Sequence, residues 1–197
     1  AARVAGGAVA RRFLEEFGVE IHSHTLAIGG KRAKIAAPVD WEQVERSPVR
    51  CADAAAEKDM MAAIDEAVAA GDTVGGVCEI VATGVPMGLG SHVQWDGRLD
   101  GEIAQVMMSI QSVKGVEIGD AFEMSEGRGS QAHDGIEMAE KSRYPWRRKS
   151  NRAGGIEGGI SNGEPIVTKL AVKPIPTLSN PLPSVDLATG ETVQAHF

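Results

Sequence analysis

The sequence predicts an α/β or α+β layered fold, because segments with helical patterns interleave with segments rich in β-branched residues. The clearest helix is expected over residues 53–70, which are rich in alanine and are followed by Gly71 as a helix stop. The clearest buried strand is expected from Val74 to Thr83, an apolar run with several β-branched side chains. The two kinds of element do not follow one another as regular short βα units, so the expectation stays at a mixed layered fold.

The other expected elements depend on weaker patterns. They are, in chain order, a helix to about Glu16 with Gly18 as its C-cap, a strand over residues 19–28, a Gly/Pro loop over 84–92, a helix from Leu99 to Val113, strands over 115–122 and 164–174, and a Pro-rich loop from Pro174 to Pro183. Residues 126–152 are polar and charged, and we expect a long, mobile surface loop there.

Composition limits the possible partners. The net charge of −7 and the pI of about 5.3 argue against a surface that binds nucleic acid or a membrane along its whole length. Cys51 and Cys78 are isolated, which is typical of reduced, intracellular cysteines. No apolar run is long enough for a membrane span and no signal peptide is recognisable, so a cytoplasmic protein is expected.

Both ends of the chain predict missing sequence. Ala1 lies inside a helical pattern that places Val4, Val9, Phe13 and Leu14 on one face, with no capping residue before it. The chain closes at Phe197 without a signal that ends its last element. We therefore expect residues 1–197 to be part of a single domain.

Residues 127–132 match the pattern G-x-G-x-x-A, but a dinucleotide-binding fold is not supported. That fold needs a strand directly before the glycines and a packed helix after them. The expected strand over 115–122 lies too far upstream, and the residues after His133 are too polar for a packed helix. A loop that folds over a ligand and a plain surface turn both remain open.

The run Gly154–Gly163 has an unusual density of glycine, which costs backbone entropy on folding. It is not a Walker loop, because no Lys-Ser/Thr pair follows. It is either a tight turn between strands or a backbone floor beneath a flat cofactor. The segment Lys173–Ser179 combines a cation, two rigid prolines and hydroxyl groups, which suits a phosphate or an electron-rich ring, but an exposed Pro loop after a strand explains it equally well.

The histidines and arginines do not by themselves define a site. His22 and His24 share one strand face without a third ligand nearby, so no metal site is expected. The cluster Arg143, Arg147, Arg148, Lys149 is either a solvated patch or a guide for a phosphorylated substrate. No Ser-His-Asp or Cys-His arrangement can be argued from spacing.

Several motifs together resemble the signatures of the chorismate synthase family in their usual order. They are Ser47-Pro-Val-Arg-Cys51, Gly88-Leu-Gly-Ser-His92, Ile110-Gln-Ser-Val-Lys-Gly-Val-Glu-Ile-Gly119, Gly127-Arg-Gly-Ser-Gln-Ala-His-Asp134, Ser150-Asn-Arg-Ala-Gly-Gly-Ile-Glu-Gly-Gly-Ile-Ser-Asn-Gly-Glu-Pro-Ile166 and Val172-Lys-Pro-Ile-Pro-Thr177. The resemblance covers nearly all of the chain.

The resemblance implies a fold and a reaction. It implies a β-α-β sandwich, with antiparallel sheets around a helical core, that assembles as a homotetramer. It implies reduced FMN as cofactor, with NADPH as a possible reductant, and an anti-1,4 elimination that releases phosphate from 5-enolpyruvylshikimate 3-phosphate and yields chorismate.

The resemblance also implies which residues contact the flavin, and which do not belong to this chain. The positions that match the flavin-contacting motifs are Gln131, Ala132, Gly158, Lys173, Pro174, Ile175, Pro176 and Thr177. We expect Lys173 to favour the electron-rich reduced ring and Thr177 to donate a hydrogen bond to the cofactor. The catalytic histidines and the early arginines of the family would precede Ala1, and its Arg-Ser-Asp motif would follow Phe197. No catalytic residue is therefore assigned, and the chain alone is expected to be inactive.

Two other hypotheses remain beside the enzyme. The chain is a catalytically incomplete module that binds flavin or phosphate, or it is a generic phosphate or nucleotide binder unrelated to the family.

Overall fold

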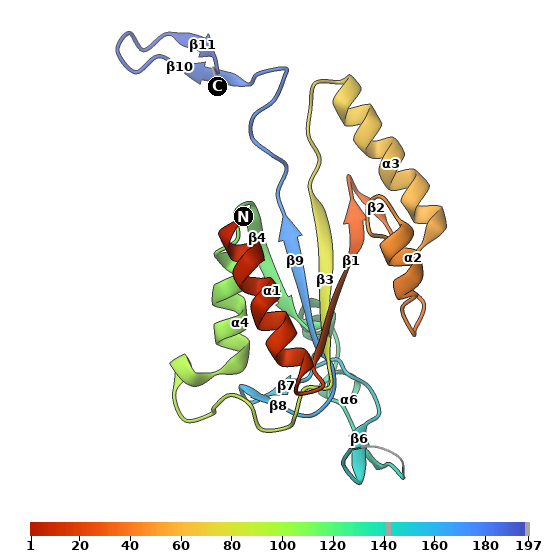
Figure 1. Cartoon of the computed structure of the whole chain (residues 1–197). Coiled ribbons are helices and arrows are strands. Elements are labelled where there is room, and N and C mark those ends of the chain that lie inside the picture. Colours follow the sequence, from red (N-terminus) through yellow and green to blue (C-terminus); the bar gives the residue numbers. More distant parts are fainter. Residues whose placement is uncertain (141–142, 196–197) are drawn as a thin grey trace. The chain divides into compact units, whose positions relative to one another are not determined.

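The computed structural model describes residues 1–140 and 143–195. It shows a mixed α/β chain built on a five-stranded sheet (Figure 1). The strand order is β2-β1-β3-β9-β4, with β1 at Glu20–Ile28, β2 at Lys31–Arg32, β3 at Gly76–Thr83, β4 at Val113–Ile118 and β9 at Ile166–Val172. Strands distant in sequence are neighbours in this sheet, so the layered α/β expectation is confirmed.

The chain divides into two compact units. The first contains residues 1–23 and 79–170, and the second contains residues 24–78 and the chain from Ala171 onward. The residues implied as flavin contacts fall in both units, with Gln131, Ala132 and Gly158 in the first and Lys173–Thr177 in the second.

Two helices, α1 (Ala2–Glu15) and α4 (Leu99–Met108), lie side by side in the first unit (Figure 1). The guanidinium of Arg3 donates to the carbonyl oxygen of Ser109 at 2.8 Å, which ties the start of α1 to the end of α4. The buried core here comprises Val19, Val85, Ile156 and Ile166, with Leu14, Leu99 and Ile103 packed against it. The face of α1 that carries Val4, Val9 and Phe13 is exposed.

Helix α4 is shorter than its periodicity predicts. It ends at Met108 instead of continuing to Val113, which begins strand β4. The turn between them places Ser112 at φ 68°, a left-handed conformation that a helix cannot contain. The apolar residues after Met108 belong to the turn and to the sheet. Because their spacing continues the apolar pattern of the helix, the sequence predicts a longer helix than the structure has.

The expected loop over residues 126–152 contains regular structure. Helix α5 spans Ala121–Glu126, helix α6 spans Gly129–Ala132, and β5 (Ile136–Met138) pairs antiparallel with β6 (Trp146–Arg148). The prediction of a loop without elements is therefore wrong for this segment, although residues 141–142 lie outside the described part and its mobility stays a prediction. Helix α5 also lies between β4 and the glycines at 127 and 129. A dinucleotide-binding fold needs a strand directly before these glycines, so this interpretation is excluded.

The second unit contains helices α2 (Trp41–Arg46) and α3 (Ala54–Ala69), of which only α3 was expected. The Asp53 carboxylate begins α3 by accepting from the backbone N–H groups of Ala55 and Ala56, and it also accepts from the N–H of Lys34. Such caps stabilise a helix by about 1 kcal/mol. Ala33, Cys51, Ala56 and Met60 form the buried core of this unit.

Beyond β9, residues 173–182 contain no helix or strand, as the prolines predict. The antiparallel hairpin of β10 (Pro183–Val185) and β11 (Thr192–Gln194) follows and was not expected. Among the described residues no helix is both long and apolar enough to cross a membrane. Phe197, where the chain closes, lies outside the described residues.

Candidate functional site

The Gly-rich run folds as a tight hairpin in the first unit. Strand β7 (Ile156–Glu157) pairs with β8 (Ile160–Ser161), and Gly158 and Gly159 form the two-residue turn between them with φ 61° and 83°. Positive φ at both turn positions strongly favours glycine. The tight-turn interpretation of the run is therefore confirmed.

The start of the run has glycine for a second reason, which is close contact between backbones. A Cβ on Gly155 would lie 2.9 Å from the carbonyl oxygen of Glu164, and a Cβ on Gly154 would lie 2.6 Å from the Cα of Gly119. Both distances are below the closest approach of real side chains, so glycine is required at these positions. The backbone of the run therefore lies directly against the turn after β4 and the approach to β9.

Gly158 differs from these glycines because its side is open. A Cβ there would meet no atom within 4 Å. The turn alone explains the positive φ at Gly158, and the space beside its backbone is open.

Ser161 joins the run to the loop that contains Gly88. Its hydroxyl donates to the carbonyl oxygen of Pro86 at 2.6 Å and accepts from the N–H of Leu89 at 2.9 Å. The backbone adds two bonds, from Gly88 N–H to the Ser161 carbonyl and from Ser161 N–H to the Leu89 carbonyl. We call these four hydrogen bonds the Ser161 seam. Ser161 is fully buried, so the seam is shielded from water.

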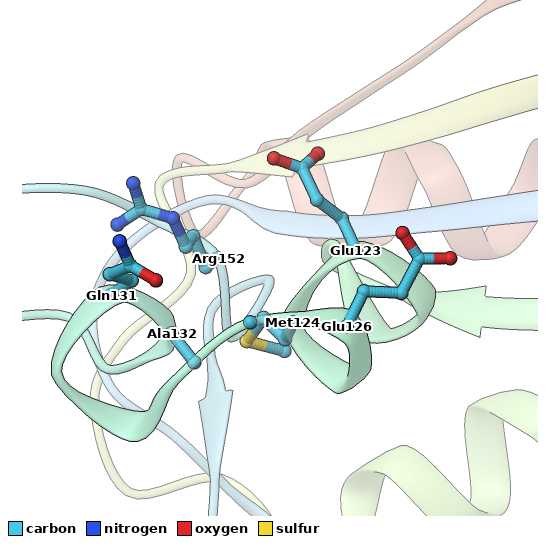
Figure 2. A pocket seen from close by; sticks show the side chains of 7 residues that line it. Glu123, Met124, Glu126, Gln131, Ala132 and Arg152 are labelled. Carbon is cyan, nitrogen blue, oxygen red and sulfur yellow. The ribbon is translucent and has the colours of Figure 1, made fainter.

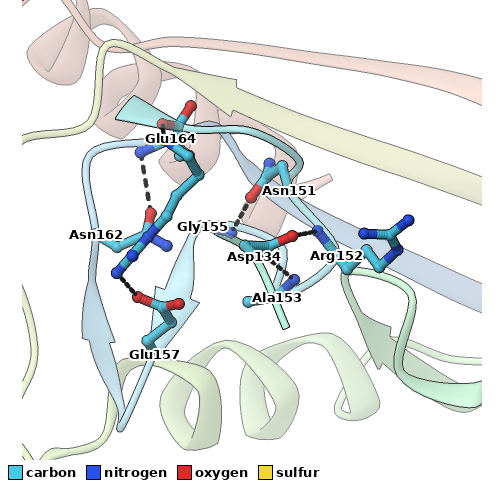
Figure 3. A network of polar contacts seen from close by, with 9 residues as sticks. Asp134, Asn151, Arg152, Ala153, Gly155, Glu157, Asn162 and Glu164 are labelled. Carbon is cyan, nitrogen blue, oxygen red and sulfur yellow. Dashed lines mark hydrogen bonds and ion pairs between the residues drawn. The ribbon is translucent and has the colours of Figure 1, made fainter. Parts of the chain in front are cut away.

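Asp134 lies two residues beyond helix α6 and joins it to the run, and Figure 3 shows its bonds to Arg152 and Ala153. One carboxylate oxygen accepts from the hydroxyl of Ser150 at 2.5 Å and from the N–H of Arg152 at 2.9 Å. The other accepts from the N–H of Ala153 at 2.9 Å. Asp134 is 8% exposed, so its charge is stabilised mainly by these donors.

The hydrogen bonds decide the charge state of Asp134. Burial raises its pKa, but the donors at Ser150, Ala153 and Arg152 lower it by more, so its pKa lies below the ordinary value of an aspartate. The carboxylate is ionised at neutral pH. Its stabilising contribution is present above the pKa of about 3.9 that an aspartate has in an unfolded chain, and it is lost as the pH falls through the lower folded value.

A cavity of about 320 Å³ lies where α5 and α6 face the start of the run (Figure 2). Its lining comprises Glu123, Met124, Glu126, Gly127, Gln131, Ala132 and Arg152. Gln131 and Ala132, two of the implied flavin contacts, therefore line a cavity that a guanidinium group also borders. The two glutamates add negative charge, so an anionic group is expected only on the Arg152 side.

Two of the four cations in the arginine cluster of the sequence are paired with carboxylates. The guanidinium of Arg147 lies 2.8 Å from the carboxylate of Glu137, and Arg148 pairs with Glu157. Arg143 lies over the ring of Tyr144, 5.9 Å from its centroid. These contacts favour a structural role for Arg147 and Arg148 over a role in guiding substrate.

The segment Lys173–Thr177 lies in the second unit and is exposed along its length. The hydroxyl of Thr73 donates to the carbonyl oxygen of Ile175 at 2.7 Å. A Cβ on Gly75 would lie 2.9 Å from Cδ of Pro174, so this glycine is needed for Pro174 to pack there. A cavity of about 540 Å³ borders Pro174, Gly75 and Thr73.

The implied flavin contacts are thus placed on both sides of β9 in the chain. The Gly-rich run precedes this strand and Lys173 follows it directly. That both segments line one ring stays a prediction. The first unit offers a glycine turn with open surroundings, and separately a cavity with polar walls that Gln131 and Ala132 line.

Sequence reasoning assigned no role to Asp134 or Ser161, which organise this region. Both residues fall inside the quoted motifs, but only burial and hydrogen bonding reveal what they do. The described residues contain no cluster of three metal-ligating side chains.

Comparisons with known proteins agree with one another. The sequence profile of the chorismate synthase family matches residues 1–197. Chorismate synthase of Moorella thermoacetica is 52% identical over 198 aligned positions, which cover 99% of this chain and 51% of that protein. The enzyme of Brevibacillus brevis is 51% identical over 196 positions, covering 98% of this chain and 50% of that protein. A crystal structure of a chorismate synthase superposes with a TM-score of 0.83 at 46% identity, covering 90% of this chain and 56% of that one.

The chain belongs to the chorismate synthase family, and it spans about half the length of the relatives it matches. The expected family fold is confirmed by the superposition. The family belongs to the lyases of aromatic biosynthesis.

The Ser161 seam leads to a test of stability. Ser161→Ala removes a buried donor and acceptor and leaves the Pro86 carbonyl and the Leu89 N–H without this partner, so we expect the free energy of unfolding to fall by about 1–3 kcal/mol. Urea denaturation followed by circular dichroism measures it. Ser179→Ala, at an exposed serine, is the matched control and should change stability little. If both variants were equally stable, the expected stabilising contribution of the Ser161 hydrogen bonds would be wrong.

Proposed function

We propose that this chain forms the flavin-contacting half of a chorismate synthase that eliminates phosphate from 5-enolpyruvylshikimate 3-phosphate. The observation that carries the proposal is the assembly of three family motifs. The Ser161 seam joins segments 88–92 and 150–166, and the Asp134 carboxylate joins segments 127–134 and 150–166. The latter two segments contribute residues to one cavity. Family membership makes an unrelated phosphate or nucleotide binder the weaker reading.

The reaction needs an electron-rich partner for the substrate. When bound, reduced FMN supplies electron density to the allylic C–O bond as phosphate leaves. The open side of Gly158 would let a ring lie against the backbone, and Gln131 and Ala132 would border it. Lys173 would place a cation near the ring, which favours its electron-rich reduced form, and Thr177 would donate a hydrogen bond to the cofactor. These residues bind and orient, and none of them is assigned a proton-transfer role.

The family resemblance also supports properties of the whole protein. It supports a cytoplasmic homotetramer, and NADPH as the reductant of the flavin in some members. Since the relatives are about twice as long as this chain, the acid–base residues of the reaction would lie outside it. We therefore propose that the 197 residues alone do not form chorismate.

One observation favours the second candidate function, a flavin- or phosphate-binding module without catalysis. The chain contains the motifs implied for the cofactor but covers only half of its relatives. The two functions differ in whether these residues support turnover when the other half of the family fold is present.

A chimera tests the proposed function directly. In it, these 197 residues replace the matching segment of Moorella thermoacetica chorismate synthase. With reduced FMN under anaerobic conditions, we expect chorismate and phosphate to form in equal amounts, as measured by chorismate absorbance and a phosphate assay. The unaltered Moorella enzyme is the control. A folded chimera that binds FMN but forms no chorismate would support the module and contradict the enzyme.

Lys173→Met in the chimera tests the cation next to the ring. Loss of the charge should weaken binding of reduced FMN more than of oxidised FMN, by about tenfold, because the reduced ring is richer in electrons. Flavin titrations under both redox conditions measure the difference. Lys58→Met, at an exposed position on α3, is the control. Unchanged flavin affinity and turnover would count against the assignment of Lys173.

Gly158→Asn tests whether the open side of the turn receives the ring. Asparagine tolerates positive φ better than other residues with a side chain, so the hairpin should persist while the new side chain fills the free space. We expect FMN affinity to fall at least tenfold. Gly190→Asn is the matched control, since Gly190 has φ 75° and equally open surroundings in the β10–β11 hairpin. Equal FMN affinity of the two variants would show that no ring lies at Gly158.

A further inference from the structure

The carboxylate of Asp134 lies between the two parts of the candidate site in the first unit. Gln131 and Ala132, which line the cavity, end two residues before it. Its hydrogen-bond donors Ser150, Arg152 and Ala153 lead directly into the Gly-rich run that turns at Gly158. A single side chain therefore connects both segments that the flavin is proposed to contact, through the bonds to Arg152 and Ala153 that Figure 3 shows.

The bonds of Asp134 also close the base of the β5–β6 hairpin. Next to it, the N–H of Lys149 donates to the carbonyl oxygen of Gly135 at 2.8 Å, and Ile136 pairs with Arg148. The hairpin alone would leave its two ends free to separate, because short two-stranded hairpins are marginally stable. The Asp134 bonds fix the spacing between α6 and the run.

Further bonds keep the run itself rigid. The side chain of Asn151 accepts from the N–H of Gly155 and donates to the carbonyl oxygen of Pro165, both at 2.8 Å. The N–H of Asp120 donates to the Arg152 carbonyl at 2.8 Å. A displacement at residues 150–153 would therefore be transmitted to the turn at Gly158 and to the cavity wall at Arg152.

The chemistry of Asp134 excludes a role as a proton donor at neutral pH. Both oxygens are occupied by donors and the group is held as a carboxylate. Its effect on a ligand must therefore act through the positions of other residues.

We propose that Asp134 is a positioning residue that holds Gln131 and Ala132 in register with the turn at Gly158, so that both contact the same ligand. The inference rests on the proposed flavin function. Small displacements of binding groups cause large losses in affinity and rate. The hydrogen bonds of Asp134 should therefore contribute more to flavin binding than to folding.

The test uses Asp134→Asn in the full-length chimera described above. The substitution keeps the shape of the side chain but turns one acceptor into an NH₂ group that faces an N–H donor, of Ala153 or of Arg152. We expect FMN affinity to fall about tenfold and the visible circular dichroism of bound flavin to change, because that signal reports the orientation of the groups around the ring. Turnover at saturating FMN should fall as well.

Asp53→Asn is the matched control. Asp53 likewise accepts three hydrogen bonds, in its case all from backbone N–H groups, and it also has a lowered pKa, but it lies in the second unit at the start of α3. It should lower the melting temperature without changing FMN affinity or the flavin spectrum. A general loss of stability would instead affect both variants alike.

Ser150→Ala decides the matter if Asp134→Asn does not fold. It removes one of the three bonds and leaves the two from backbone N–H groups, so a smaller loss of FMN affinity with the same spectral change is expected. If the unsubstituted chimera binds FMN and turns over, but these variants keep its affinity and spectrum, the positioning role is wrong. If the unsubstituted chimera fails to bind FMN, the proposed function fails instead.

Discussion

Contact between backbones without intervening side chains is the constraint on which the first unit depends. Gly154 packs on Gly119 and Gly155 packs on the 164–165 backbone, at distances that no Cβ allows. These contacts place the β7–β8 hairpin directly on the turn after β4 and on the entry to β9. The high glycine content of the run therefore has two physical causes, close packing at its start and a left-handed turn at Gly158 and Gly159.

Polar side chains complete what the glycines begin. Backbone groups packed this closely are shielded from water and need hydrogen-bond partners, because a buried donor or acceptor without a partner costs free energy. Asn151, Asp134 and Ser161 supply those partners from within the segment and from its neighbours. The region is thus held by these hydrogen bonds together with the apolar core that contains Ile156 and Ile166.

Local signals explain which parts of the fold could be predicted. Helix α3 has good helix formers, a capping aspartate and a terminal glycine, and β3 has a β-branched run, so both were located closely. The β5–β6 hairpin was missed because each strand has only three residues, which include charged ones, and the connection from Met138 to Trp146 is longer than a tight turn. Helix α4 was predicted too long because the apolar residues after Met108 serve the turn and the sheet, which periodicity does not distinguish.

The candidate site was predictable only in part. Motif resemblance led to Gln131, Ala132 and Gly158, but Asp134 was not singled out because a sequence pattern does not indicate whether an aspartate is buried.

Amide hydrogen exchange of the full-length chimera, with and without FMN, tests the central claim most directly. The account predicts slower exchange on FMN binding in residues 127–132 and 154–160 of this chain. Protection that is absent from both segments while FMN is bound would contradict it.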